Sequence, residues 1–347
     1  MSVSILAFFN NKAGVGKTSI VYHLAWMYAD LGINVVAADL DPQANLTAAF
    51  LPEDRMMQLW PDGDHPETVY GSLQPLIRGV GDVKPPHLER ISARLALLPG
   101  DLFLSNFEDQ LSEVWPKCLD GDERAFRVTS AFWRVMQLAA GQQDANLVLL
   151  DLGPNLGAIN RAALISCDYV VVPLSPDLFS LQGLRNLGPR LRTWRIDWRK
   201  RLEANPAADL KLPTGTMKPI GYVIQQHSVR LDRPVQAYDR WITQIPSTYR
   251  RAVLNEASPG PLSFESDPEC LALLKHYRSL MPMAQQARKP MFHLKPADGA
   301  LGSHFQAAQA ARADFAKLAT KIASRVSVEI PDRQPALRFI TPPPPPG

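Results

Sequence analysis

The residues best suited to chemistry lie near the amino end, in the segment NNKAGVGKTS. Gly14 and Gly16 permit a positive φ and a close approach of the backbone to an anion, so that successive N–H groups can point at phosphate oxygens. Lys17 would then supply a positive charge for the outer phosphates, and Thr18 a hydroxyl for Mg²⁺. The segment has the outline of a phosphate-binding loop, although Asn11 occupies the position of the first glycine in the strict pattern.

A loop of this kind lies between a strand and a helix, and the flanking residues predict both. SILAFFN, which precedes the loop, is a short apolar run typical of a buried strand. After the loop, apolar residues recur at helical spacing up to Gly32, where a helix commonly ends. The loop would therefore lie at a helix N-terminus, where free N–H groups and aligned peptide dipoles favour an anion.

Further apolar runs predict the sheet that carries this loop. They are INVVAADLD, LALLPG, NLVLLDLGP, YVVVPLSP and PIGYVIQQ, and most are separated by enough chain for a crossover helix. This alternation predicts an α/β fold, a doubly wound and mostly parallel sheet flanked by helices, with ligands at the carboxyl ends of the strands. We expect a single P-loop domain over residues 1–326, with irregular insertions near 51–90 and 116–125. Residues 51–81 are expected to form loop with one short helix.

The carboxyl end divides into two parts. SHFQAAQAARADFAKLATKIASRV carries an apolar stripe at helical spacing, which predicts a closing helix packed on the sheet. Ser303 and Gln306 have the spacing of a capping box at the start of that helix. Residues 327–347 are expected to form a proline-rich, disordered tail.

Composition limits the classes of protein that remain. The net charge of +3 is slight, so partners must be inferred from local clusters. The 3 cysteines lie far apart, which predicts buried thiols and neither a disulfide framework nor a metal site, and the 7 histidines show no ligand spacing. We find no secretory signal and no run of about 18 apolar residues, so we expect a cytoplasmic protein without membrane contact.

Acidic residues end two of the predicted strands. Asp39 and Asp41 close the second strand as DLDPQANLT, and Asp151 closes the fourth as LLDLGPN. Mg²⁺ takes oxygen ligands, often through water, and triphosphate hydrolysis needs a group that orients the attacking water. Each aspartate alone could equally belong to a turn. Together with Lys17 and Thr18, the three carboxylates predict a site for a nucleoside triphosphate and Mg²⁺.

These motifs resemble those of a known family. NKAGVGKTS is similar to the deviant Walker A motif of the ParA/MinD superfamily of ATPases, and DLDPQANLT resembles a segment of the ParA (Soj-type) chromosome and plasmid partition proteins. The likeness continues through LLDLGPNLGAINRAAL and IPSTYRRAVLNEASPGPLSFE and covers most of residues 1–326. It implies a slow ATPase that forms a homodimer with ATP, binds duplex DNA nonspecifically on the nucleoid, and segregates or positions DNA or cargo. A ParB-like or adaptor protein would stimulate hydrolysis.

The resemblance also implies roles for single residues. Lys12 takes the position of a lysine that reaches the nucleotide of the partner subunit, and Asp41 that of the residue that positions the attacking water. Asp39 and Asp151 would support Mg²⁺ through its waters, and Gln225 would contact adenine. The residues that would cradle ATP, with Thr18 also on Mg²⁺, are Ala13, Gly14, Val15, Gly16, Lys17, Thr18 and Ser19.

The DNA-binding surface has a candidate in RLRTWRIDWRKR, which carries 6 basic residues and 1 acidic residue. On a helix Arg192, Arg195 and Arg199 would share one face that follows DNA phosphates, and Arg230 could extend it. The alternative is a solvated helix face whose tryptophans pack inward. Two other functions stay open: a nucleotide-switched scaffold that positions a protein complex without DNA, and a MinD-like membrane-cycling ATPase, which would carry an amphipathic membrane helix.

Overall fold

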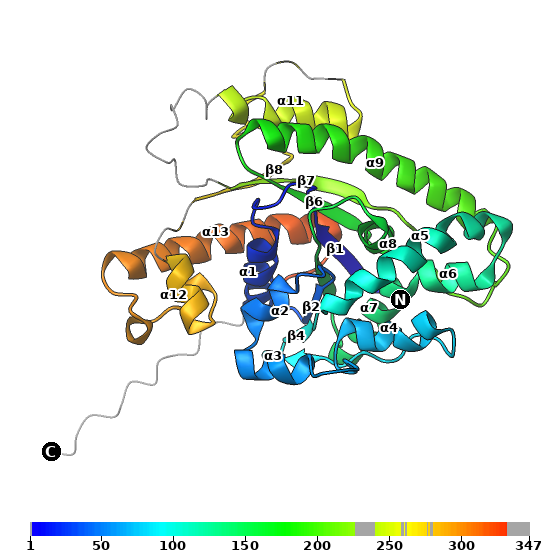
Figure 1. Ribbon diagram of the computed structural model, residues 1–347. Helices are drawn as coiled ribbons and strands as arrows, with labels where there is room; N and C mark the ends of the chain where they lie inside the picture. Colours follow the sequence, from blue (N-terminus) through cyan, green and yellow to red (C-terminus); the bar gives the residue numbers. More distant parts are fainter. Residues whose placement is uncertain are drawn as a thin grey trace.

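The structure, a computed structural model, describes residues 2–225, 240–257, 260, 262–275, 277 and 280–331. Its centre is a sheet of eight strands (Figure 1), which are β1 Ser4–Phe8, β2 Val35–Asp39, β3 Glu89–Arg90, β4 Leu95–Leu98, β5 Leu147–Asp151, β6 Tyr169–Leu174, β7 Lys218–Gln225 and β8 Cys270–Leu274. The strand order is β3-β4-β2-β5-β1-β6-β7-β8, and every neighbouring pair except β3–β4 is parallel. The predicted doubly wound α/β fold is confirmed.

Helices cover both faces of the sheet. One layer holds α1 Lys17–Asp30, α2 Asn45–Phe50, α3 Glu53–Leu59, α12 Leu280–Ala287, the 3₁₀ turns η4 Met291–His293 and η5 Pro296–Asp298, and α13 Ser303–Val326. The other holds α4 Val69–Arg78, η1 Leu102–Asn106, α5 Phe107–Lys117, η2 Cys118–Asp120, α6 Glu123–Thr129, α7 Ala131–Gln143, α8 Ala158–Ile165, α9 Leu178–Glu203, α11 Ile245–Tyr249 and the π-helical turn η3 Arg250–Leu254.

The alternation of side chains along the strands produces two hydrophobic cores. On β1, Ile5 and Ala7 face the layer of α4 to α9, whereas Leu6 and Phe8 face the layer of α1 and α13. Because helices cover both faces, the central strands are apolar up to the aspartates that end β2 and β5, as their sequence predicted. The three cysteines are buried and free, in agreement with the sequence.

The register of the central strands positions the phosphate-binding loop. β1 pairs with β5 so that Phe8 lies opposite Asp151, and β2 pairs with β5 so that Asp39 also lies opposite Asp151. The chain leaves β1 immediately after Phe8 and enters the loop that leads to α1. The loop and both aspartates therefore meet at one edge of the sheet, as expected for parallel strands.

Some local expectations were wrong. Residues 51–81 contain two helices, α3 and α4, where one was expected; Thr68 caps α4 by accepting a hydrogen bond from Gly71 N. The capping box at Ser303 and Gln306 does not form, because the chain enters α13 through Gly302 at φ 53° and no side chain caps the helix. Strands β3 and β8 were not predicted, since β3 has 2 residues and the short apolar run CLALL of β8 has no periodicity that distinguishes a strand from a buried helix segment.

The contact between α9 and η3 allows a direct test of packing. A Cβ on Gly188 would lie 1.9 Å from the backbone oxygen of Ala252. We expect Gly188→Ala to lower the free energy of unfolding in urea by about 1–3 kcal/mol, because overpacking outweighs the better helix propensity of alanine. Gly141 in α7 is the matched control, since no atom lies within 4 Å of a Cβ built there. Gly141→Ala should stabilise by about 0.5–1 kcal/mol; the same sign for both variants would contradict this account.

Candidate nucleotide site

The loop between β1 and α1 has the backbone of an anion cradle. Gly14 and Gly16 adopt φ values of 72° and 73°, and Gly16 is the N-cap residue of α1 without any side-chain cap. The first N–H groups of α1 therefore remain directed at the cavity in front of the loop. A Cβ on Gly16 would lie 2.2 Å from the amide of Gln225, whose Nε2 donates to Gly16 O over 3.2 Å. A side chain at position 16 would be strained at this φ and would displace the Gln225 amide, which holds the loop from the end of β7.

The two lysines of the loop point in different directions. Lys17 is 7% exposed, lines the cavity and donates from Nζ to the backbone oxygen of Lys12 over 3.3 Å. Burial lowers the pKa of Lys17, while the charges of Asp151 and Asp41 act in the opposite direction. The side chain of Lys12 does not line this cavity; its ammonium forms an ion pair with Asp177 at the start of α9. No sequence pattern pointed to Asp177.

The donor set beside the loop fits Mg²⁺. Thr18 Oγ1 donates to Asp151 Oδ2 over 2.7 Å, and Asp151 Oδ1 is buried with no hydrogen-bond partner in the described part of the chain. Burial and the neighbouring charge of Asp39 raise the pKa of Asp151 well above its ordinary value. A buried carboxylate oxygen without a donor, next to a threonine hydroxyl, suits a hard cation and its water shell. Thr18 and Asp151 are thus the residues that would hold the metal.

Asp39 and Asp41 have different surroundings. Asp39 is fully buried, and its Oδ2 accepts from both N and Oγ1 of Thr47 in α2 at 2.8 Å. Burial raises the pKa of Asp39 to about 7. Asp41, by contrast, lines the cavity, is 6% exposed and accepts from Gln43 N over 3.0 Å. The structure therefore brings Asp41 to the cavity, whereas Asp39 lies behind it and holds α2.

The cavity in front of the loop has a volume of about 750 Å³. Besides loop residues from Ala13 to Ser19, its walls come from α1, α2 and α12; Val15 is buried beneath the loop and does not line it. Met281 and Gln285 of α12 close one side, a wall that no motif in the sequence predicted. Its only signal was an apolar stretch after β8, far from the loop in sequence.

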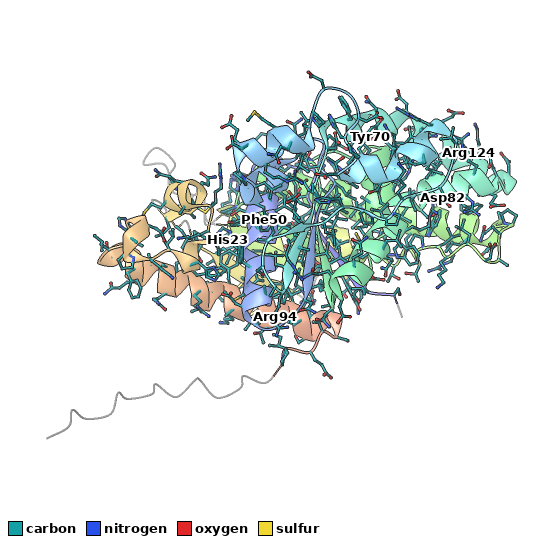
Figure 2. All side chains as sticks on the ribbon, turned by 90° about the horizontal axis from the view of Figure 1, so that it is seen from below. His23, Phe50, Tyr70, Asp82, Arg94 and Arg124 are labelled. Carbon is teal, nitrogen blue, oxygen red and sulfur yellow. The ribbon has the colours of Figure 1, made fainter. Side chains whose placement is uncertain are left out.

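A buried histidine fixes one side of this cavity. His23 Nδ1 lies 2.7 Å from Ser19 O, and its Nε2 accepts from Met291 N over 3.3 Å. Burial lowers the pKa of His23 to about 4, so the imidazole is neutral and Nδ1–H is the donor to Ser19. Figure 2 labels His23 on α1 and Phe50 on the neighbouring α2. His23 thereby links the first turn of α1 to η4.

The predicted basic surface is partly used for internal contacts. Arg192 donates to Ala252 O over 2.7 Å, and Arg195 donates to Thr216 O and Met217 O, each over 2.8 Å. Trp194 and Trp198 pack inward, whereas Arg199 is exposed. Arg230 lies outside the described residues. Of the predicted DNA-contacting arginines within the described ranges, Arg199 alone is exposed and has no hydrogen bond to the protein.

Known proteins share part of this sequence. A family model described as an AAA domain (AAA_31) matches residues 3–204. Protein IncC of Escherichia coli is 32% identical over 178 residues, which are 51% of this chain and 43% of that protein. The sporulation initiation inhibitor protein Soj of Bacillus subtilis is 27% identical over 183 residues, 53% of this chain and 62% of Soj. The chain thus covers less than two thirds of the length of either relative.

Solved structures share the fold. Protein DIP2308 of Corynebacterium diphtheriae superposes with a TM-score of 0.69 at 23% identity, over 93% of this chain and 99% of that one. The McdA–ATP complex of Cyanothece gives a TM-score of 0.58 at 13% identity, over 96% and 99% of the two chains. At these identities the likeness concerns the fold alone.

The sheet, the glycine loop and the Lys17, Thr18 and Asp151 cluster define a P-loop nucleotide-binding protein of the deviant Walker A class. Since the family model covers more than half of the sequence, the chain belongs to the AAA_31 family, within the ParA/MinD superfamily of partition ATPases. In the described ranges, no helix has both the length and the apolar character needed to span a membrane.

The buried carboxylates predict how stability depends on pH in the absence of nucleotide. Burial raises the pKa of Asp39 from 3.8 to about 7, so the folded state holds this proton more tightly than the unfolded state. The resulting stabilisation is complete below the unfolded pKa and is lost as the pH rises through the folded pKa. Between about pH 5 and pH 7 we expect the free energy of unfolding to fall by up to about 1.4 kcal/mol per pH unit from this group.

Urea denaturation at several pH values measures this slope. Asp39→Asn cannot ionise and should flatten the slope. Asp64→Asn removes an exposed carboxylate, with 63% of its side chain accessible, and should leave the slope as it is. A slope unchanged in Asp39→Asn would show that another group carries the pH dependence.

Proposed function

We propose that this protein is a ParA-like ATPase that dimerises on binding ATP, binds duplex DNA nonspecifically in that state, and releases it when a ParB-like or adaptor protein stimulates hydrolysis. The observation that carries the proposal is the joint placement of Lys17, Thr18 and Asp41 on one cavity. Asp151 is hydrogen-bonded to Thr18, and Lys12 is directed away from the cavity. The first four residues suit nucleotide binding in one subunit. Lys12 suits contact with a second subunit.

Several surface features support the dimer. Lys12 lies beside the start of α9, where Leu178 is 43% and Phe179 is 70% exposed. Exposed apolar side chains next to a cavity rim favour contact with another protein surface. A lysine supplied by the partner would neutralise charge on the phosphates, as an arginine finger does, and would make hydrolysis depend on pairing. The bound ATP in the McdA complex is consistent with a triphosphate ligand for this fold.

Different residues of the chain would have different roles in ATP hydrolysis. Lys17 would bind the outer phosphates, and Thr18 and Asp151 would hold Mg²⁺, which when bound would neutralise charge on the phosphates. Asp41 is the carboxylate at the cavity wall, and its Oδ1 lies close to the backbone of Gly153 after β5. This placement supports a role in orienting the attacking water in front of the loop.

A nucleotide-switched scaffold without DNA binding is the second candidate. It is favoured by the contacts of Arg192 and Arg195 with backbone carbonyl groups, which leave fewer cations available to phosphates. Exposed cations remain near these contacts: Arg199 and Lys218 line a shallow cavity of about 330 Å³, and Arg190, Lys200 and Arg251 are exposed as well. DNA binding would then depend on these residues and not on Arg192 and Arg195.

Hydrolysis tests the role of Asp41. We expect Asp41→Asn to slow phosphate release at least about 100-fold, because the amide cannot accept a proton from the attacking water. Binding of a fluorescent ATP analogue should persist, since Lys17 and the loop remain. Asp54→Asn, an exposed carboxylate in α3, is the control and should hydrolyse ATP at the rate of the unmodified chain. Unchanged hydrolysis in Asp41→Asn would remove Asp41 from the reaction.

Duplex DNA binding tests the function itself. Fluorescence anisotropy with ATP, with ADP or without nucleotide, at several salt concentrations, should show binding with ATP alone. The logarithm of the DNA association constant should fall linearly with the logarithm of the salt concentration. Arg199→Ala should make this dependence less steep, by about one for each phosphate that its guanidinium would neutralise. Lys317→Ala removes an exposed cation from α13 on the opposite layer and should leave the slope unchanged. Absence of binding in all states would reject the DNA function and favour the scaffold.

A further inference from the structure

The ion pair between Lys12 and Asp177 joins the phosphate-binding loop to α9. Both side chains are partly buried, with 23% of Lys12 and 18% of Asp177 accessible. Asp177 uses its two oxygens differently: Oδ2 accepts from Lys12 Nζ, and Oδ1 accepts from Ser180 N over 2.9 Å as the N-cap of α9. The cap fixes the carboxylate in place. Lys12 is therefore held by a rigid acceptor and not by a flexible surface side chain.

The backbone next to Lys12 is fixed to the same region. Lys12 N donates to Asn10 Oδ1 over 3.0 Å, and Asn10 Nδ2 donates to Pro173 O at the end of β6 over 2.8 Å. A Cβ on Gly183 of α9 would lie 2.9 Å from Asn10 Oδ1. The residues before the loop thus lie directly against the first turns of α9, with the side chain of Lys12 crossing to Asp177.

We propose that Asp177 is a positioning residue that holds Lys12 in the single subunit, and that this ion pair must open before Lys12 can reach the nucleotide of a second copy of the chain. This inference rests on the proposed function, which supplies the second copy. While its charge is matched by Asp177, the ammonium is directed to α9 and away from the phosphates of either subunit. Opening the pair opposes dimerisation, so Asp177 sets how readily the ATP-bound chains associate.

The proposal predicts the size of the effect. A partly exposed ion pair changes an equilibrium constant by roughly two- to fivefold. A symmetric dimer opens one such pair in each subunit, so the factor is squared. Loss of the Asp177 charge should therefore lower the dimer dissociation constant by about 4- to 25-fold.

The test uses Asp177→Asn in the full chain. Asparagine is nearly isosteric and caps helices as well as aspartate does, so α9 should keep its start while the charge facing Lys12 disappears. Sedimentation velocity with AMPPNP and Mg²⁺ gives the dimer dissociation constant, and a thermal melt shows that the variant folds. Asp197→Asn on the same helix is the matched control, because it removes the same charge from a residue that does not contact Lys12.

A second measurement reports on the ion pair in the single subunit. Trace labelling with acetic anhydride, read by mass spectrometry, gives the acylation rate of Lys12 in the nucleotide-free chain. Asp177→Asn should increase this rate severalfold, since the neutral amide does not hold the lysine in an ion pair. Asp197→Asn should leave it unchanged.

The outcomes separate the alternatives. The proposal is supported if Asp177→Asn lowers the dimer dissociation constant of the unmodified chain and has no effect on that constant in a Lys12→Ala chain. The proposal is overturned if Asp177→Asn leaves dimerisation unchanged or weakens it. It is also overturned if Asp177→Asn tightens the dimer equally in the Lys12→Ala background, or if Asp197→Asn tightens the dimer as much as Asp177→Asn does. An unchanged acylation rate of Lys12 overturns the ion pair itself. In a further outcome, the unmodified chain and Asp177→Asn both remain monomeric with AMPPNP, while Lys12 is acylated faster in the variant. The ion pair would then be real, but the proposed dimer, and with it the role of Asp177 in dimerisation, would be rejected.

Discussion

The structure depends above all on burying carboxylates where three parallel strands end together. Asp151 at the end of β5 lies opposite both β1 and Asp39 of β2, fully buried, and is joined to α1 by the hydrogen bond from Thr18. A buried carboxylate is costly unless donors or cations neutralise it. Asp39 meets this requirement through Thr47, but Asp151 keeps one oxygen without a donor in the described chain. The fold thereby keeps a buried carboxylate oxygen beside the nucleotide loop that a cation would stabilise.

The helix α9 connects features that are distant in sequence. Its first turn receives Lys12 through Asp177, its middle packs closely on η3 at Gly188, and its last turns carry Arg195 and Arg199. A single helix therefore extends from the nucleotide loop to the proposed DNA surface (Figure 1). Movement of Lys12 on dimerisation would act on α9, the helix that also carries Arg195 and Arg199. This gives a physical connection between the proposed dimerisation and the proposed DNA binding.

The wall formed by α12 extends the nucleotide site beyond the matched family region. The family model ends at residue 204, whereas Met281 and Gln285 line the cavity from the other end of the chain. His23 ties this region to the first turn of α1 through Met291 N. The phosphate end of the cavity is thus built from the shared part of the chain, and its far side from residues outside that part.

Local sequence patterns were enough to predict the central strands, the phosphate-binding loop and the residue types of the site. Apolar runs ending in Asp39 and Asp151, and the glycines before Lys17, are local patterns with local physical causes, so the central strands and the loop were predicted. Tertiary structure alone decided which side chains meet. Asp177 holds Lys12 from 165 residues away, and Arg192 and Arg195 turn to backbone carbonyls supplied by later segments. Such contacts depend on strand order and on helix packing, which bring distant residues together without leaving a periodic pattern in the sequence.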